Sequence, residues 1–114
     1  MVRRYVPLAG DIIWLDFDPQ AGRREQGKRR PALVVTEQAY NRASGLALVC
    51  PLSSHRKPYP FALPVMVDKV EGAVLVDHLE SLDWAARKAT FHAKADLALL
   101  AKVRAYLGVL LGIR

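Results

Sequence analysis

Four residues near the middle of the sequence have side chains that could act together on a phosphodiester. Arg30 opens an apolar run that begins at Pro31, and Ser53, Ser54 and His55 follow a second apolar run. An arginine can stabilise charge on a phosphate, hydroxyls can donate hydrogen bonds to its oxygens, and an imidazole can transfer protons near neutral pH. RNA supplies its own nucleophile, the 2′-OH, so this set needs neither a metal ion nor a nucleophilic side chain. The residues can act together only if the two strand ends meet.

A strongly basic segment precedes Arg30. Residues 22–30 contain five basic residues and one acid: Arg23, Arg24, Glu25, Lys28, Arg29 and Arg30. Cations at the base of a buried strand could position the backbone of a phosphate-rich polymer. The alternative is a solvated loop whose charges only keep the protein soluble. The charge density favours binding and leaves both interpretations open.

Other chemistries find little support in the sequence. The histidines, His55, His78 and His92, are scattered, and Cys50 is the single cysteine, so no HExxH or CxxC spacing exists. Glycine-rich phosphate motifs and the GxSxG elbow are also absent. We therefore predict no metal ion and no cofactor. We interpret Cys50 as a small core residue, and His78 and His92 as structural.

Length and charge limit the class of protein. The 114 residues predict one domain, 1–114, with a core of its own, and the net charge of +6 favours an acidic partner. A nucleic acid or an acidic peptide fits better than a phospholipid surface, because no basic amphipathic helix is evident. Without a bilayer-spanning apolar run, a secretory leader or paired cysteines, we expect a cytoplasmic protein.

The hydrophobic pattern predicts short strands followed by one helix. Strands are predicted at 12–17, 31–36, 46–52, 61–67, 73–77 and 88–92, with a helical turn at 37–42, a turn at 68–72, a bend at 79–84 and an amphipathic helix at 95–111. Pro64 places the fourth strand at an edge, and the apolar fifth strand is predicted to be central. Trp14 could stack on a base, although core packing is the favoured interpretation. These elements predict a small, strongly bent antiparallel sheet or barrel with one closing helix.

The motifs also occur in a characteristic order. They are GDIIWLDFDP at 10–19, a basic loop followed by RPALVV at 30–35, CPLSSHRKPYPF at 50–61 and GAVLVDHLESLDW at 72–84. This ordered set spans nearly the whole chain and resembles the MazF/PemK family of toxin endoribonucleases, its MazF branch more than its Kid or ChpB branches.

The resemblance implies a fold, an activity and partners. The fold would be an SH3-like or CcdB-like barrel with a C-terminal helix, working as a homodimer. The activity would be metal-independent, sequence-specific cleavage of single-stranded RNA that leaves 2′,3′-cyclic phosphate and 5′-OH ends. The basic residues that bind the RNA would also be the surface that an acidic, MazE-like antitoxin covers.

The resemblance also implies site residues. Arg30 matches the family's catalytic arginine, Ser53 stands where most members have threonine, and Glu25 matches a position linked to activity. His55 is a further candidate for proton transfer, with a surface histidine as the alternative. The residues expected to contact RNA are Arg23, Arg24, Lys28, Arg29, Ser54, Arg56 and Trp14. A Kid-like scheme is disfavoured, because Asp77 is present but Leu75 replaces its arginine.

Two other functions remain open from the sequence. The chain could be a catalytically silent SH3-like module that binds RNA or an acidic peptide, and serine in place of threonine at position 53 supports this alternative. It could also be a gyrase-directed toxin of the CcdB type, against which the RP and YPF motifs argue.

Overall fold

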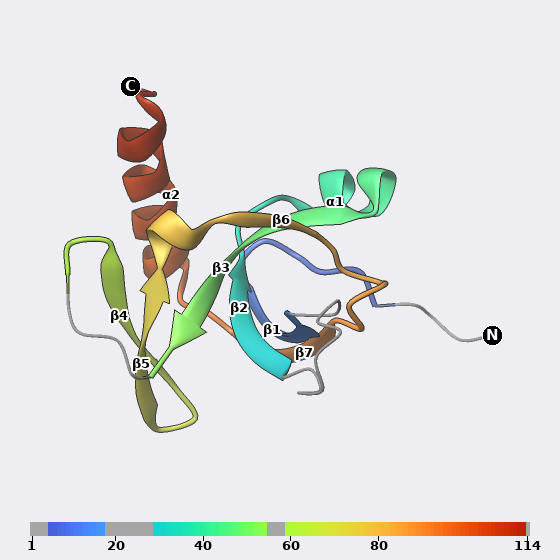
Figure 1. Cartoon of the computed structure of the whole chain (residues 1–114), viewed down its shortest axis with the longest axis horizontal. Helices are drawn as coiled ribbons and strands as arrows, with labels where there is room; N and C mark the ends of the chain where they lie inside the picture. Colours follow the sequence, from blue (N-terminus) through green and yellow to red (C-terminus); the bar gives the residue numbers. More distant parts are fainter. Residues whose placement is uncertain (1–4, 18–28, 55–58, 114) are drawn as a thin grey trace.

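The chain folds into one bent antiparallel sheet with two helices, in a computed structural model that describes residues 5–17, 29–54 and 59–113 (Figure 1). In chain order the elements are β1 (Asp11–Asp16), β2 (Arg29–Val34), α1 (Gln38–Ser44), β3 (Leu46–Ser53), β4 (Ala62–Val67), β5 (Val70–Leu75), the 3₁₀ turn η1 (Val76–His78), β6 (Glu80–Asp83), β7 (Thr90–Lys94) and α2 (Leu97–Leu111). The strand order is β4-β5-β3-β2-β1-β7, and β6 also pairs with β3. The predicted fold class is confirmed.

Strand β3 connects the two halves of the sheet. One of its edges pairs with β2, and the other pairs first with β6 and then, at Leu52 and Ser53, with β5. The pairing register shifts by three residues between β5 and β6, and the three residues of η1 absorb this shift. Figure 1 shows the β4–β5 hairpin on one side of β3 and β1, β2 and β7 on the other.

Three sequence predictions around η1 are wrong. The strand predicted at 73–77 ends at Leu75, and the bend predicted at 79–84 is strand β6. The turn predicted at 68–72 is shorter, because β5 already begins at Val70. An apolar run alone does not show where a strand breaks, since the break here depends on pairing with β3.

Both faces of the central strands are buried, in two separate clusters. Ile12 belongs to one cluster, whereas Ile13 and Leu15 belong to the other, because successive side chains of a strand point to opposite faces. Helix α2 covers the first cluster with Leu100, Val103 and Leu107. The helix begins two residues later than predicted, after an extended N-cap.

Two local predictions are confirmed. Pro64 lies in β4, which is an edge strand, so its missing N–H removes no hydrogen bond between two inner strands of the sheet. Cys50 is fully buried in the core, with its Sγ 3.8 Å from the carbonyl oxygen of Val76. Burial, and secondarily the charge of Asp77, raise the pKa of this thiol to about 12, so it stays protonated and inert at neutral pH.

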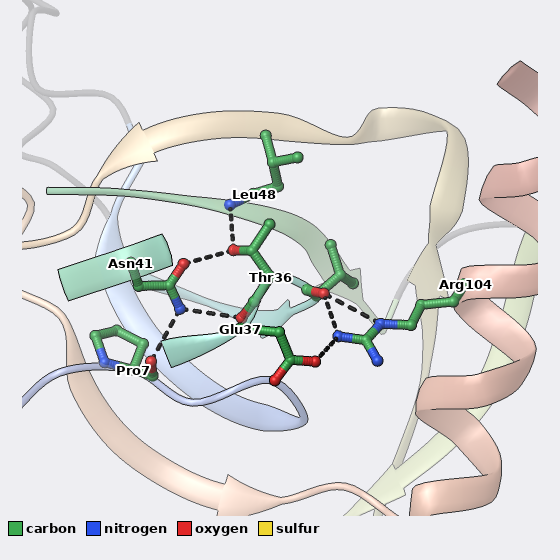
Figure 2. Close-up of polar contacts among 7 residues, drawn as sticks. Pro7, Thr36, Glu37, Asn41, Leu48 and Arg104 are labelled. Atoms are coloured by element: carbon green, nitrogen blue, oxygen red, sulfur yellow. Dashed lines mark hydrogen bonds and ion pairs between the residues drawn. The ribbon is translucent and has the colours of Figure 1, made fainter. Parts of the chain in front are cut away.

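A buried asparagine fixes the connection after β2 (Figure 2). Asn41 is fully buried, and its amide nitrogen donates to the carbonyl oxygens of Pro7 and Thr36 at 2.9 and 3.0 Å. The Thr36 hydroxyl donates to Asn41 at 2.6 Å and accepts from the Leu48 amide at 3.1 Å. The side chain therefore joins the N-terminal segment, α1 and β3, with its polar atoms satisfied.

A second contact in Figure 2 ties α2 to the same connection. The Arg104 guanidinium donates to the Val35 carbonyl oxygen at 2.7 Å and to Glu37 at 2.9 Å. Both charged side chains are exposed, so the ion pair itself contributes little to stability. The backbone contact anchors the helix beside the C-terminal end of β2.

Candidate active site

The first residues of β2 and the last residues of β3 lie at the same end of the sheet. The antiparallel register runs from Val34 opposite Val49 to Ala32 opposite Pro51. Arg30 and Ser53 each lie two residues beyond the last pair of this ladder. The two strand ends therefore lie at the same end of the sheet, and one pocket is lined by Pro31 on the β2 side and by Ser53 on the β3 side.

Arg30 has a guanidinium available for a ligand. Its side chain is exposed, and among the residues that the structure describes it has no hydrogen-bond or ion-pair partner. Its backbone lies in β2 opposite Leu15, a fully buried residue of β1. Arg30 thus combines a fixed backbone with an uncommitted cation, which suits the recognition of a phosphate.

The neighbouring Arg29 is committed to internal contacts. Its Nη1 forms an ion pair with Asp16 at 2.9 Å, and its Nη2 donates to the carbonyl oxygens of Trp14 and Lys88 at 3.2 and 2.7 Å. Nη2 also lies 3.2 Å from the Thr90 hydroxyl. These contacts join β1, β2 and β7 at the base of Arg30, so this guanidinium is less free to hold RNA than the sequence suggested.

A second arginine supports the same corner. Arg87 donates from Nη1 to the carbonyl oxygens of Asp16 and Phe17, both at 3.1 Å. The amide of Asp16 in turn donates to the Arg87 carbonyl oxygen at 3.0 Å. The end of β1 is therefore held from two sides.

A pocket of about 370 Å³ lies where the start of β2 and the end of β3 come close, and it is lined by Pro31 and Leu52 among others. Its polar and aromatic wall consists of Trp14, Ser53, Ser54, Asp68, Glu71 and His92. These residues come from β1, β7, the end of β3 and the β4–β5 hairpin, so the bend of the sheet creates the pocket.

Trp14 belongs to this wall and to neither core cluster. It is half-buried, and its ring lies against that of His92 with a centroid separation of 5.1 Å. The favoured prediction of core packing is therefore wrong. Trp14 shares a face of β1 with the core residue Ile12, and this face runs from the core out into the pocket.

His92 reaches Trp14 because β7 contains a bulge. Ile12 pairs with Ala93 but Ile13 pairs with Phe91, so His92 is the extra residue. Ala93 packs on the first core cluster, and the adjacent His92 contacts Trp14, so two consecutive residues face one side. Bulges re-aim side chains in this way. The sequence contains no signal for this bulge, so His92 was missed as a site residue.

Two acids of the β4–β5 hairpin were also missed. Asp68 begins the tight turn with a φ of 53°, and its Oδ2 lies 3.5 Å from Nε2 of His92. Glu71 is exposed on the same wall. Asp68 reads as an ordinary turn residue in the sequence, and only the pairing of distant strands brings it to the pocket.

Ser53 is half-buried and Ser54 is exposed, at the point where β3 ends. Gly72 of β5 lies against this point: a Cβ at position 72 would approach the Ser53 carbonyl oxygen to 3.1 Å. The close approach of the two backbones therefore fixes the position of the Ser53 backbone at the edge of the pocket.

The remaining predicted site residues lie outside the described residues. They are Arg23, Arg24, Glu25, Lys28, His55 and Arg56. In the described part of the chain, no group of three or more histidine, cysteine, aspartate or glutamate side chains could hold a metal ion. The two helices of this part are too short or too polar to span a membrane.

Comparison with known proteins defines the class of this fold and site. Residues 8–111 match the family described as PemK-like, MazF-like toxin of type II toxin–antitoxin system. The chain belongs to this family.

Individual relatives agree with the family match. The chain is 39% identical over 112 residues to the endoribonuclease toxin MazF of Escherichia coli K12, which covers 98% of this chain and all of that protein. It is 36% identical to the endoribonuclease toxin ChpB of the same strain, over 78% of this chain and 80% of that protein. The crystal structure of MazE-MazF (Form-II) from Deinococcus radiodurans superposes with a TM-score of 0.85 at 50% identity, over 97% of this chain and all of that chain.

Proposed function

We propose that this toxin is an endoribonuclease that cleaves single-stranded RNA at a short sequence without a metal ion. The proposal is supported above all by one observation: the exposed, uncommitted guanidinium of Arg30 and the hydroxyl of Ser53 come from adjacent antiparallel strands, β2 and β3, at the same end of the sheet. Membership of a family of toxins whose relatives are named endoribonucleases agrees with it.

In the proposed reaction the RNA supplies the nucleophile. The 2′-oxygen attacks the adjacent phosphorus, a P–O2′ bond forms and the P–O5′ bond breaks. The proton of the 2′-OH passes to a base and a proton passes from an acid to the leaving 5′-oxygen. The products are a 2′,3′-cyclic phosphate and a 5′-OH.

The proposed catalytic residues stabilise charge and transfer protons. Arg30 stabilises the charge that builds up on the phosphate oxygens and takes part in proton transfer, and Ser53 donates a hydrogen bond to a non-bridging oxygen. Glu25 and His55 are the candidates for the other proton-transfer group. Serine lacks the methyl group that restricts the χ1 angle of threonine, so neighbouring backbone contacts must position it.

The RNA backbone is proposed to contact further basic residues besides Arg30. These are Arg23, Arg24, Lys28 and Arg56, and the hydroxyl of Ser54 is proposed as an additional contact. Arg29 is assigned a positioning role instead, because its guanidinium is occupied by Asp16 and three neutral acceptors.

We further propose two protein partners and a compartment. An acidic antitoxin segment would cover the proposed RNA-binding residues, Arg30 among them, as the MazE-MazF relatives suggest. A second copy of the chain would cover the exposed apolar residues of the C-terminal region, which are Leu97, Val109, Leu111 and Ile113. The proposed RNA substrate and the single, free cysteine support a cytoplasmic location.

The test is cleavage of a long unstructured RNA by the purified protein in EDTA, with mapping of the 5′ ends. We expect discrete cuts with 5′-OH ends that disappear in Arg30→Ala. The matched control is Arg42→Ala, which removes an exposed arginine from α1 outside the site. Intact RNA from folded, antitoxin-free protein would favour the silent binding module, and cuts that EDTA abolishes would contradict the mechanism. Inhibition of DNA supercoiling without RNA cleavage would favour a gyrase-directed toxin.

A further inference from the structure

The pocket beside Ser53 has a composition that does not suit a phosphate. Its wall contains two carboxylates, Asp68 and Glu71, which repel a phosphodiester. Its aromatic side consists of Trp14 and His92, whose ring planes are inclined by 47°. Planar, uncharged and polar-edged groups fit such a site better than anions do.

A nucleobase has these properties. Single-stranded RNA is recognised by splaying bases out onto tryptophan and histidine rings and by hydrogen bonds to their edges. The pocket, at about 370 Å³, is lined by Ser53 and by Pro31, the residue that follows Arg30 in β2. A phosphate held by Arg30 and Ser53 would bring a neighbouring base to the pocket.

The two acids define which base edge is favoured. Carboxylates accept hydrogen bonds from exocyclic amino groups, as aspartate and glutamate do from cytosine N4. Uracil has no amino group and would turn carbonyl oxygens toward these charges. A base with an exocyclic amino group is therefore preferred over uracil.

Local geometry holds these groups in place. The turn, with a φ of 53° at Asp68, sets the backbone from which this carboxylate extends to within 3.5 Å of His92 Nε2, and the β7 bulge directs His92 into the pocket. The acids and the rings belong to different halves of the sheet, so the bend that brings them together also sets the width of the pocket.

We propose that this pocket is a base-recognition subsite, in which Trp14 and His92 stack on one nucleobase of the RNA and Asp68 and Glu71 select a base with an exocyclic amino group. The inference rests on the proposed ribonuclease function. It adds three residues, His92, Asp68 and Glu71, that the sequence did not assign to the site.

The test uses a single-stranded RNA pool with a randomised segment, cut by the full chain and sequenced at the cut ends. The wild-type protein is expected to disfavour uracil at one position near the cut. Asp68→Asn with Glu71→Gln should reduce that discrimination by about tenfold. Asparagine tolerates positive φ, so the turn is preserved. Glu80→Gln removes one acid from β6 outside the pocket and should leave the preference unchanged.

Trp14 provides a separate readout. Trp14→Leu should lower kcat/KM by about tenfold or more, and Trp14→Phe, which keeps an aromatic ring, should recover most of the loss. Absence of any cuts by the wild-type protein would overturn the proposed function together with this inference. Cuts whose base preferences are the same in the Asp68–Glu71 double variant would overturn this inference alone.

Discussion

Replacement of Arg29 by alanine tests whether this residue positions the site or holds RNA. In the structure its guanidinium joins Asp16 of β1 to Lys88 and Thr90 at the start of β7. Arg30 is the next residue along β2. Loss of these contacts should loosen the strand end that carries the proposed catalytic guanidinium, without removing that guanidinium.

The size of the effect follows from the contacts. The partly exposed ion pair with Asp16 contributes about 0.5 kcal/mol. Nη2 faces three neutral acceptors with only two hydrogens, and these contacts contribute roughly 2 kcal/mol together. The free energy of unfolding should fall by about 2–3 kcal/mol, or about 10 °C in Tm. Because displacement of a catalytic group by about 1 Å can cost about a hundredfold in rate, kcat should fall at least tenfold.

Thermal unfolding and steady-state cleavage of a fluorogenic RNA oligonucleotide would measure both effects. Arg29→Lys keeps the charge but not the planar fork, so it should recover only part of kcat. Arg42→Ala is the control for loss of a surface arginine. The positioning role is refuted if Arg29→Ala keeps its Tm and kcat but raises KM and makes the salt dependence shallower, the behaviour of a phosphate contact.

Three further predictions concern buried or closely packed residues. Burial raises the pKa of the Cys50 thiol from 9.0 to about 12. The thiol therefore ionises at a lower pH in the unfolded chain than in the folded chain, and the free energy of unfolding should fall as the pH rises from about 9 to 12. In denaturant titrations over this pH range, the free energy of unfolding of Cys50→Ala should fall less steeply. Gly72→Ala places a Cβ 3.1 Å from the Ser53 carbonyl oxygen. The variant should lower kcat severalfold with only a small change in Tm. If kcat and the folded fraction fell by the same factor, the effect would not be specific to Ser53. Asn41→Ala leaves the buried Pro7 carbonyl oxygen and the partly buried Thr36 carbonyl oxygen without this donor. It should cost about 2–3 kcal/mol in denaturant unfolding, whereas a loss below about 0.5 kcal/mol would mean that water replaces the amide.

Patterns that are local in the sequence predicted the fold well. The alternation of Ile12 and Ile13 between two buried faces, and the spacing of Leu100, Val103 and Leu107 on α2, follow from the strand and helix periods. The edge position of β4 follows from one proline. Each of these features depends on residues that are neighbours in the chain.

Features that depend on pairing between distant strands were not predicted. The division between β5 and β6 is set by the register against β3, and the position of His92 is set by a bulge against β1. Asp68 reaches His92 only because the sheet bends. The sequence could therefore name Arg30 and Ser53 from their motifs, but it could not identify the pocket beside them.

The central claim is that the RNA itself supplies the nucleophile at Arg30 and Ser53. The most direct measurement compares two RNA oligonucleotides that contain the mapped cleavage sequence, one of which has a single 2′-deoxynucleotide on the 5′ side of the cut. Our account predicts that this one substitution abolishes cleavage, and that the all-ribose oligonucleotide yields a 2′,3′-cyclic phosphate in EDTA. Cleavage of the deoxy-substituted oligonucleotide at the same bond would mean that water or a side chain attacks, and it would contradict the account.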